Sequence, residues 1–130
     1  MAFTFTVEDG TGLAAANSYA SISYADDYHE GRGNTAWTHS SVTDAEKENA
    51  LVRATDYIEK RFGTKFRGWR GSSTQSLQWP RIDAEDNAGY LVSGVPDKLK
   101  QAVTEYAMRS ISLHELSPDP ISPVPVQKNL

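Results

Sequence analysis

The chain has 130 residues, enough for one modest hydrophobic core and too few for two independent ones. It contains no cysteine, which excludes disulfides, thiolate catalysis and thiolate metal sites. The mean hydropathy of -0.54 indicates either that much of the surface is polar or that part of the chain does not pack within its own domain. We find no long apolar run and no basic leader followed by one, so we expect neither a membrane span nor a signal peptide.

Charge is unevenly distributed along the chain. The net charge is -4, but residues 60–81 hold six basic side chains and no acidic one. The rest of the chain has the other seven basic side chains and all 17 acidic ones, so its formal charge is -10. We therefore expect a molecule with one basic and one acidic surface.

The N-terminal third predicts a strand and a short helix. Residues 3–7 alternate Phe-Thr-Phe-Thr-Val, the period of a half-buried strand, and residues 8–12 have turn chemistry. Ser21 can cap a helix over residues 22–30, which the following glycines end. We expect a loop after it, with Trp37 as its one large anchor.

Two longer helices follow. Thr43-Asp44-Ala45-Glu46 is a capping box, and it predicts a helix that runs to Phe62. A third helix opens at Pro96 and ends near Leu116. The expected buried faces are Leu51, Ala54, Thr55, Ile58 and Phe62 on one helix, and Leu99, Ala102, Val103, Tyr106, Ala107, Ser110 and Leu113 on the other.

The sequence thus predicts a mainly α fold. We expect a small bundle of about three to four helices with a short N-terminal strand, a long central loop or hairpin arm over residues 63–94, and an extended C-terminal tail. Residues 1–116 form one domain, and residues 117–130, with four prolines, form an extended arm. The apolar residues of this tail suggest docking on another chain, and they are Ile121, Val124, Val126 and Leu130.

No pattern supports catalysis, a cofactor or a metal. The three histidines, His29, His39 and His114, have no metal-ligand spacing, and we interpret them as surface or loop residues. Asp26 and Asp27 are interpreted as solvated. No serine stands in a Gly-x-Ser-x-Gly turn, and no Walker lysine motif is present.

The central loop carries the functional signal. Basic residues interleaved with aromatic ones suit single-stranded nucleic acid, because they neutralise phosphates and stack on bases. The alternative is that the aromatic residues fold the loop onto the core while the arginines meet acidic groups of a protein. The candidate contact residues, for a neighbouring subunit or another protein, are Lys65, Arg67, Trp69, Arg70, Trp79 and Arg81.

An ordered set of motifs resembles one family across about residues 5–115. The set comprises residues 5–12, 17–19, 25–28, 32–37, 51–58, the Gln75-x-Leu77-x-Trp79-Pro80-Arg81 box, and 95–103. It resembles the head-to-tail adaptor, or connector, proteins of tailed bacteriophages, whose relatives are also labelled DnaT-like single-stranded DNA-binding proteins.

For the adaptor interpretation, the resemblance implies a structural, non-enzymatic protein of the virion neck, assembled in the host cytoplasm. The protomers form a ring, commonly of twelve copies, between the portal protein and a tail-side neck or stopper protein. DNA passes through the ring without sequence-specific contact, and no membrane or cofactor takes part. The alternative is a single-stranded DNA-binding protein of the DnaT-like type.

Overall fold

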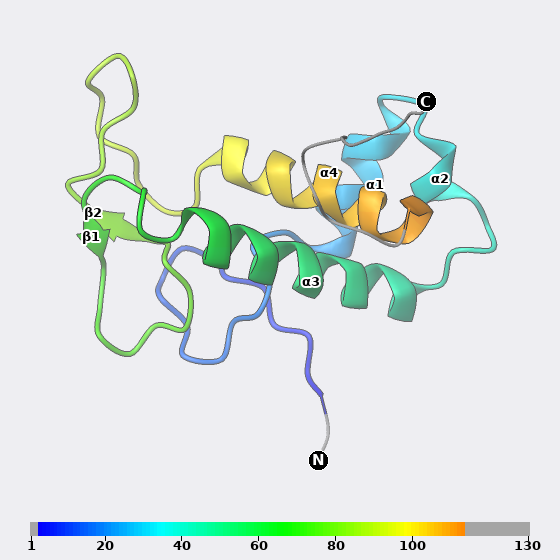
Figure 1. Cartoon of the computed structure of the whole chain (residues 1–130), viewed down its shortest axis with the longest axis horizontal. Helices are drawn as coiled ribbons and strands as arrows, with labels where there is room; N and C mark the ends of the chain where they lie inside the picture. Colours follow the sequence, from blue (N-terminus) through cyan, green and yellow to red (C-terminus); the bar gives the residue numbers. More distant parts are fainter. Residues whose placement is uncertain (1–2, 114–130) are drawn as a thin grey trace, which may run out of the picture.

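Two long antiparallel helices form the body of the molecule (Figure 1). The computed structural model describes residues 3–113. Helices α3 (Asp44–Phe62) and α4 (Asp97–Leu113) lie side by side, and α1 (Ile22–Glu30) and α2 (Thr35–Thr38) lie at one end. Residues 63–94, which we call the arm, lie at the other end and contain β1 (Trp69–Arg70) and β2 (Arg81–Ile82). The predicted mainly helical fold is confirmed.

The helix starts follow the capping signals in the sequence. The Ser21 hydroxyl accepts a hydrogen bond from the Tyr24 amide at 3.0 Å, and α1 begins at the next residue. The Thr43 hydroxyl accepts from the Glu46 amide at 3.2 Å, while the Glu46 carboxylate accepts from the Thr43 amide at 2.9 Å. Both ends of the capping box are therefore formed, and α3 has the predicted bounds.

The core lies between α3 and α4 and is completed by α1 and α2. Leu51, Ala54 and Ile58 of α3 are buried against Val103 and Ala107 of α4. The small side chains let the two helices approach closely, and this matches the predicted buried faces. The fully buried Trp37 closes the α1–α2 end of the core.

The predicted N-terminal strand over residues 3–7 does not form. Its only sheet-like pairing among the described residues is one parallel bridge between Val7 and Ser18. The reason is that a side chain takes the place of a neighbouring strand. The Asn17 amide oxygen accepts from the Thr6 amide at 2.9 Å, and its nitrogen donates to the Thr4 carbonyl at 2.9 Å. The alternating pattern therefore marks an extended segment rather than a sheet strand.

One further prediction is corrected by the structure, and those for the C-terminal part of the chain lie outside the described residues. The segment around Trp37 is a single helical turn rather than a loop, since the Asn34 carbonyl accepts from the amides of Trp37 and Thr38. The predicted end of the third helix near residue 116, the domain boundary that follows it and the tail 117–130 fall outside residues 3–113.

Candidate functional site

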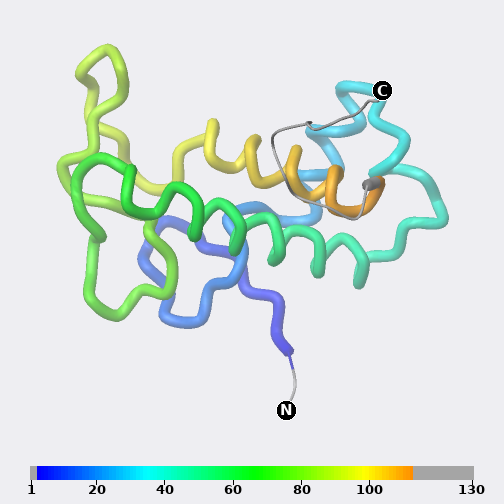
Figure 2. Tube along the Cα trace, viewed as in Figure 1, coloured from blue at the N-terminus to red at the C-terminus, as the bar shows by residue number. Residues whose placement is uncertain are grey.

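The arm is a two-stranded hairpin with long loops. Strands β1 and β2 pair antiparallel, with Trp69 opposite Ile82 and Arg70 opposite Arg81. The first strand follows Gly68, whose φ of +71° and close approach to the Ile82 carbonyl leave no room for a Cβ atom. Figure 2 shows the chain at the base of the arm running beside the N-terminal segment. The Ser76 amide donates to the Leu13 carbonyl there at 3.1 Å.

A buried polar cluster attaches the arm to α3. The Glu59 carboxylate accepts from the Tyr19 hydroxyl and from the Gln78 amide, the latter at 3.1 Å. The Tyr19 hydroxyl in turn accepts from the Trp79 amide at 3.1 Å. Burial raises the pKa of Glu59 above its usual value, against the opposing hydrogen bonds from Tyr19 and Gln78. Burial, followed by the bond to Glu59, also raises the pKa of Tyr19.

The arginines of the arm hydrogen-bond to its own main chain. Arg81 donates to the carbonyls of Arg67 and Gly68, both at 2.8 Å. Arg67 donates to the Glu85 carbonyl at 3.1 Å, and Arg70 donates to a carbonyl in the loop between the strands. These guanidinium groups thus hold the arm together, and their positive charges stay at its surface.

An open groove lies along the hairpin around an exposed indole. Trp69 is 59% exposed and lines this groove, whose volume is about 510 Å³, together with Arg70, Arg81 and Gln78. The hydroxyl residues Ser72 and Ser73 complete the described lining. A flat aromatic face, two cationic groups and two hydroxyls therefore meet in one place, which we call the Trp69 groove.

At its other end, the arm has a projecting loop with two exposed apolar side chains, and we call this loop the finger. Residues 85–91 form a loop that a bridge between Glu85 and Leu91 closes, and the Asp86 carboxylate accepts from the Tyr90 amide at 3.0 Å. Tyr90 and Leu91 are 72% and 69% exposed. The finger extends away from the helical body in Figure 1. Large exposed apolar side chains on a projecting loop are typical of a protein contact.

The six predicted contact residues fall into three groups. Trp69 and Arg70 are exposed in the Trp69 groove, and Arg81 is half-buried there. Lys65 and the exposed Arg67 line a second groove, described below. Trp79 lies in the core at 6% exposure, packed edge-to-face on Phe66. The tail residues Ile121, Val124, Val126 and Leu130 lie outside the described residues.

Three structural features escaped the sequence analysis. Asp26 is not simply solvated, because it accepts from the Trp37 indole and from the buried Lys47 ammonium, both at 2.8 Å. The sequence left open whether Tyr28 or His29 lies on the apolar face of α1, and the structure buries His29 fully, with its Nε2 3.0 Å from the Thr104 carbonyl. The partners of each residue are too distant in the sequence for a short motif to reveal them.

The third feature is a carboxylate captured by a turn. Glu8 is buried, and its two oxygens accept from the amides of Gly10, Gly12 and Leu13 at 2.8–2.9 Å. The carboxylate fixes the predicted turn over residues 8–12 because it satisfies three main-chain donors at once. This explains a buried acid without assigning it any chemistry.

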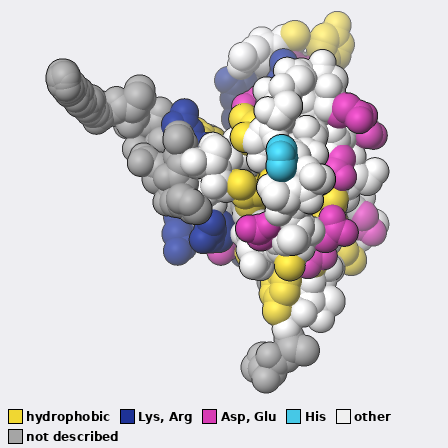
Figure 3. All heavy atoms as spheres, turned by 90° about the vertical axis from the view of Figure 1, so that its right-hand side faces the viewer, with side chains coloured by type: hydrophobic (Ala, Val, Ile, Leu, Met, Phe, Trp, Pro, Cys, Tyr) yellow, Lys and Arg dark blue, Asp and Glu magenta, His cyan; other side chains and the backbone are white. Residues whose placement is uncertain are grey.

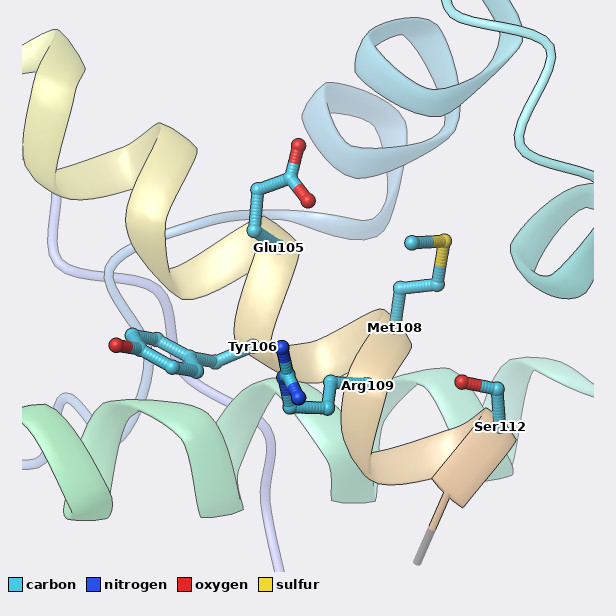
Figure 4. A pocket seen from close by; sticks show the side chains of 5 residues that line it. All are labelled: Glu105, Tyr106, Met108, Arg109 and Ser112. Carbon is cyan, nitrogen blue, oxygen red and sulfur yellow. The ribbon is translucent and has the colours of Figure 1, made fainter. Parts of the chain in front are cut away.

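Another pocket of the described surface does not bring its side chains together as a catalytic or metal site would. A pocket of about 240 Å³ on α4 is lined by Glu105, Tyr106, Met108, Arg109 and Ser112, and Figure 4 shows these side chains diverging along one helix. Within residues 3–113, no group of three His, Asp or Glu side chains could hold a metal ion. The described helices include none that combines the length and apolar character needed to cross a bilayer.

Fold and surface together define a small helical protein with a projecting basic and aromatic arm. Over residues 3–127, the chain matches the model of the family described as "Putative DnaT-like ssDNA binding protein", and it belongs to this family. No curated protein and no solved structure matches it. The match agrees with the DnaT-like label of the resemblance, whereas the adaptor role stays a prediction.

Proposed function

We propose that this protein binds single-stranded DNA through the Trp69 groove. The observation that carries the proposal is the exposed Trp69 indole, which lines one groove together with Arg70 and Arg81. Membership of a family described by single-stranded DNA binding supports the same ligand.

The chemistry of the groove suits a nucleotide. A base stacks on the indole face, and stacking of this kind contributes about 1–3 kcal/mol per base. Arg70 offers the phosphates its charge and the N–H donors that the arm carbonyl does not use. Arg81 offers chiefly its charge, because its guanidinium already donates to Arg67, Gly68 and Gln78. Because the groove is open and every base has an aromatic face, we expect binding without strong sequence preference.

Oligonucleotide titration of the purified chain tests this function. A fluorescent oligothymidine should bind in low salt and dissociate as salt is raised, with a log–log slope of about -1.4 for the two phosphate contacts of Arg70 and Arg81. Trp69→Ala should weaken binding by about tenfold or more, as loss of one stacked base predicts. Tyr90→Ala is the matched control, since Tyr90 is an equally exposed aromatic residue of the arm outside the groove. No binding in low salt, or equal loss in both variants, would contradict the proposal.

A second candidate function is the head-to-tail adaptor of a tailed phage. The observation that favours it is the apolar surface of the arm, where Ile82 is exposed opposite Trp69 and Tyr90 and Leu91 are exposed on the 85–91 loop. In a ring of about twelve copies, each protomer meets its neighbour through two different surfaces. Figure 3 supports such asymmetry, because acidic side chains gather on one side of the face shown and basic ones on the other. The arm then contacts the next subunit or the portal protein, and the tail contacts a stopper.

Mass measurement and particle imaging separate the two functions. An adaptor should form a closed oligomer, alone or with the portal protein, and Tyr90→Asp with Leu91→Asp should abolish that assembly. The chain should also be present in the neck of the virion. A monomer at all concentrations, together with absence from the neck, would remove the adaptor and leave DNA binding.

A further inference from the structure

A second, more apolar groove lies where the arm meets the start of α4. Its volume is about 330 Å³, and Phe66, Trp79, Val92 and Pro96 form its apolar lining. Lys65, Arg67 and Lys98 contribute basic side chains to the same lining, and Glu85, Asp86 and Asn87 contribute acidic and amide ones. The size is at the lower end of the range for sites that hold a small ligand or a few residues of peptide. We call it the Trp79 groove.

One polar atom of this region has no partner. The Nε1 atom of Trp79 is buried, and none of the described residues accepts a hydrogen bond from it. Buried indole N–H groups ordinarily have an acceptor, because an unmade bond costs the desolvation of the donor. Trp79 lines the groove, so an occupant rich in acceptors that displaces the atoms now covering Nε1 can satisfy the donor.

We propose that residues 121–126 of this same chain occupy the Trp79 groove. The segment reads Ile-Ser-Pro-Val-Pro-Val, so its prolines remove main-chain donors and leave carbonyl acceptors. Proline-rich segments bind aromatic-lined grooves in this way, and they lose little conformational entropy because they are already extended. Ile121, Val124 and Val126 supply apolar side chains for Phe66 and Val92.

The length of chain beyond the described residues fits this docking. Helix α4 has 17 residues and is therefore about 25 Å long, with Pro96 and Lys98 of the groove at its start. An extended proline-rich chain rises about 3.1 Å per residue, so eight residues after Leu113 span the same distance. The eighth is Ile121, where the apolar run begins. A tail that returns along α4 thus reaches the groove at Ile121, the first residue of the proposed segment.

Engineered cysteines test the docking in the full chain, which has no cysteine of its own. Ile121→Cys combined with Lys98→Cys should oxidise to a disulfide within one chain, seen as loss of both thiols and faster migration on a non-reducing gel. The matched control combines Ile121→Cys with Ser40→Cys. Ser40 is exposed between α2 and α3, at the end of the molecule where α4 finishes, so random collision favours the control pair. A disulfide equally fast in the control, a dimeric product or no disulfide would overturn the proposal.

A second measurement reads the indole directly. The chain has three tryptophans, so three indole N–H signals are expected in a nitrogen–proton spectrum, and Trp79→Phe assigns the relevant one. Ile121→Asp should shift the Trp79 signal while the Trp37 signal stays in place. An unchanged Trp79 signal would overturn the docking even if the cysteine variants failed to fold.

Discussion

The hydroxyl of Tyr19 donates a hydrogen bond to the carboxylate of Glu59, and this pair joins three parts of the chain. Tyr19 follows the N-terminal turn, Glu59 belongs to α3, and the Trp79 amide that donates to Tyr19 belongs to the arm. Both side chains lie in or at the edge of the core, where an unmade hydrogen bond is costly. The position of the arm therefore depends on a bond that lies outside the arm.

Tyr19→Phe should destabilise the protein by about 1–3 kcal/mol, because it removes a donor from Glu59 and an acceptor from the Trp79 amide. Urea unfolding followed by tryptophan fluorescence measures the change. Tyr28→Phe is the matched control: its hydroxyl also donates to a glutamate, Glu105, but at an exposed position. That variant should lose less than about 1 kcal/mol. Equal losses would contradict a special role for the buried pair.

His29 should make stability depend on pH. Burial lowers its pKa below the usual 6.5, against the hydrogen bond to the Thr104 carbonyl, which raises it. Since that carbonyl can only accept, Nε2 carries the proton and Nδ1 accepts from the Asn34 side-chain amide. The folded state thus binds a proton less readily than the unfolded state does. The resulting stability is fully present above pH 6.5 and is lost as the pH falls through the folded pKa.

Stability curves of wild type and His29→Gln check this effect. The difference in unfolding free energy between them should shrink as the pH falls from about 7.5 to about 5. The control is His39→Gln, since His39 is exposed. A wild-type curve parallel to that of His29→Gln would show that His29 does not titrate differently on folding.

Gly68→Ala should destabilise the arm through two additive causes. A Cβ atom there would lie 2.1 Å from the Ile82 carbonyl, and the φ of +71° is itself unfavourable for alanine. Gly94 has nearly the same φ, +67°, with no atom within 4 Å of a Cβ. Gly94→Ala should therefore lose about 1–2 kcal/mol from backbone strain alone, and Gly68→Ala clearly more. Urea unfolding of both variants compares them, and equal losses would contradict the close approach.

Asp26→Ala should lower the unfolding free energy by about 2 kcal/mol or more. The carboxylate is the hydrogen-bond acceptor for the Trp37 indole and the ion-pair partner of Lys47, and both of those side chains are buried. Its loss leaves an unpaired donor and an unpaired charge. Asp27→Ala, at the exposed neighbouring position, should stay within about 0.5 kcal/mol. Thermal unfolding of the two variants measures the contrast.

Local signals allowed the helices to be predicted from the sequence, and long-range contacts escaped the same reasoning. Ser21 and the Thr43 box act within three residues, so the starts of α1 and α3 were predictable. The pairing of Asp26 with Lys47 spans 21 residues and depends on how α1 packs beside α3. The Phe3–Val7 alternation predicted a strand, but no periodicity could show that an asparagine side chain would serve as its neighbour.

The sequence indicated which segment contains the candidate site, but it did not show how the side chains of that segment are arranged. Residues 63–94 stood out by charge and aromatic content, and Trp69 is exposed as a contact residue requires. Trp79 is the same residue type ten positions later, yet it lies in the core because the Trp79 amide and the Glu59–Tyr19 pair fix the base of the arm there.

Many hydrogen bonds within the arm run from arginine side chains to main-chain carbonyls. Most hairpins are instead held by a longer series of amide-to-carbonyl bonds between their strands, which here are only two residues long. The attachment of the arm to the body is of another kind, because it uses the Glu59 carboxylate of α3, which accepts from the Gln78 amide. Burial raises the pKa of Glu59, so we expect this attachment to weaken as the pH falls.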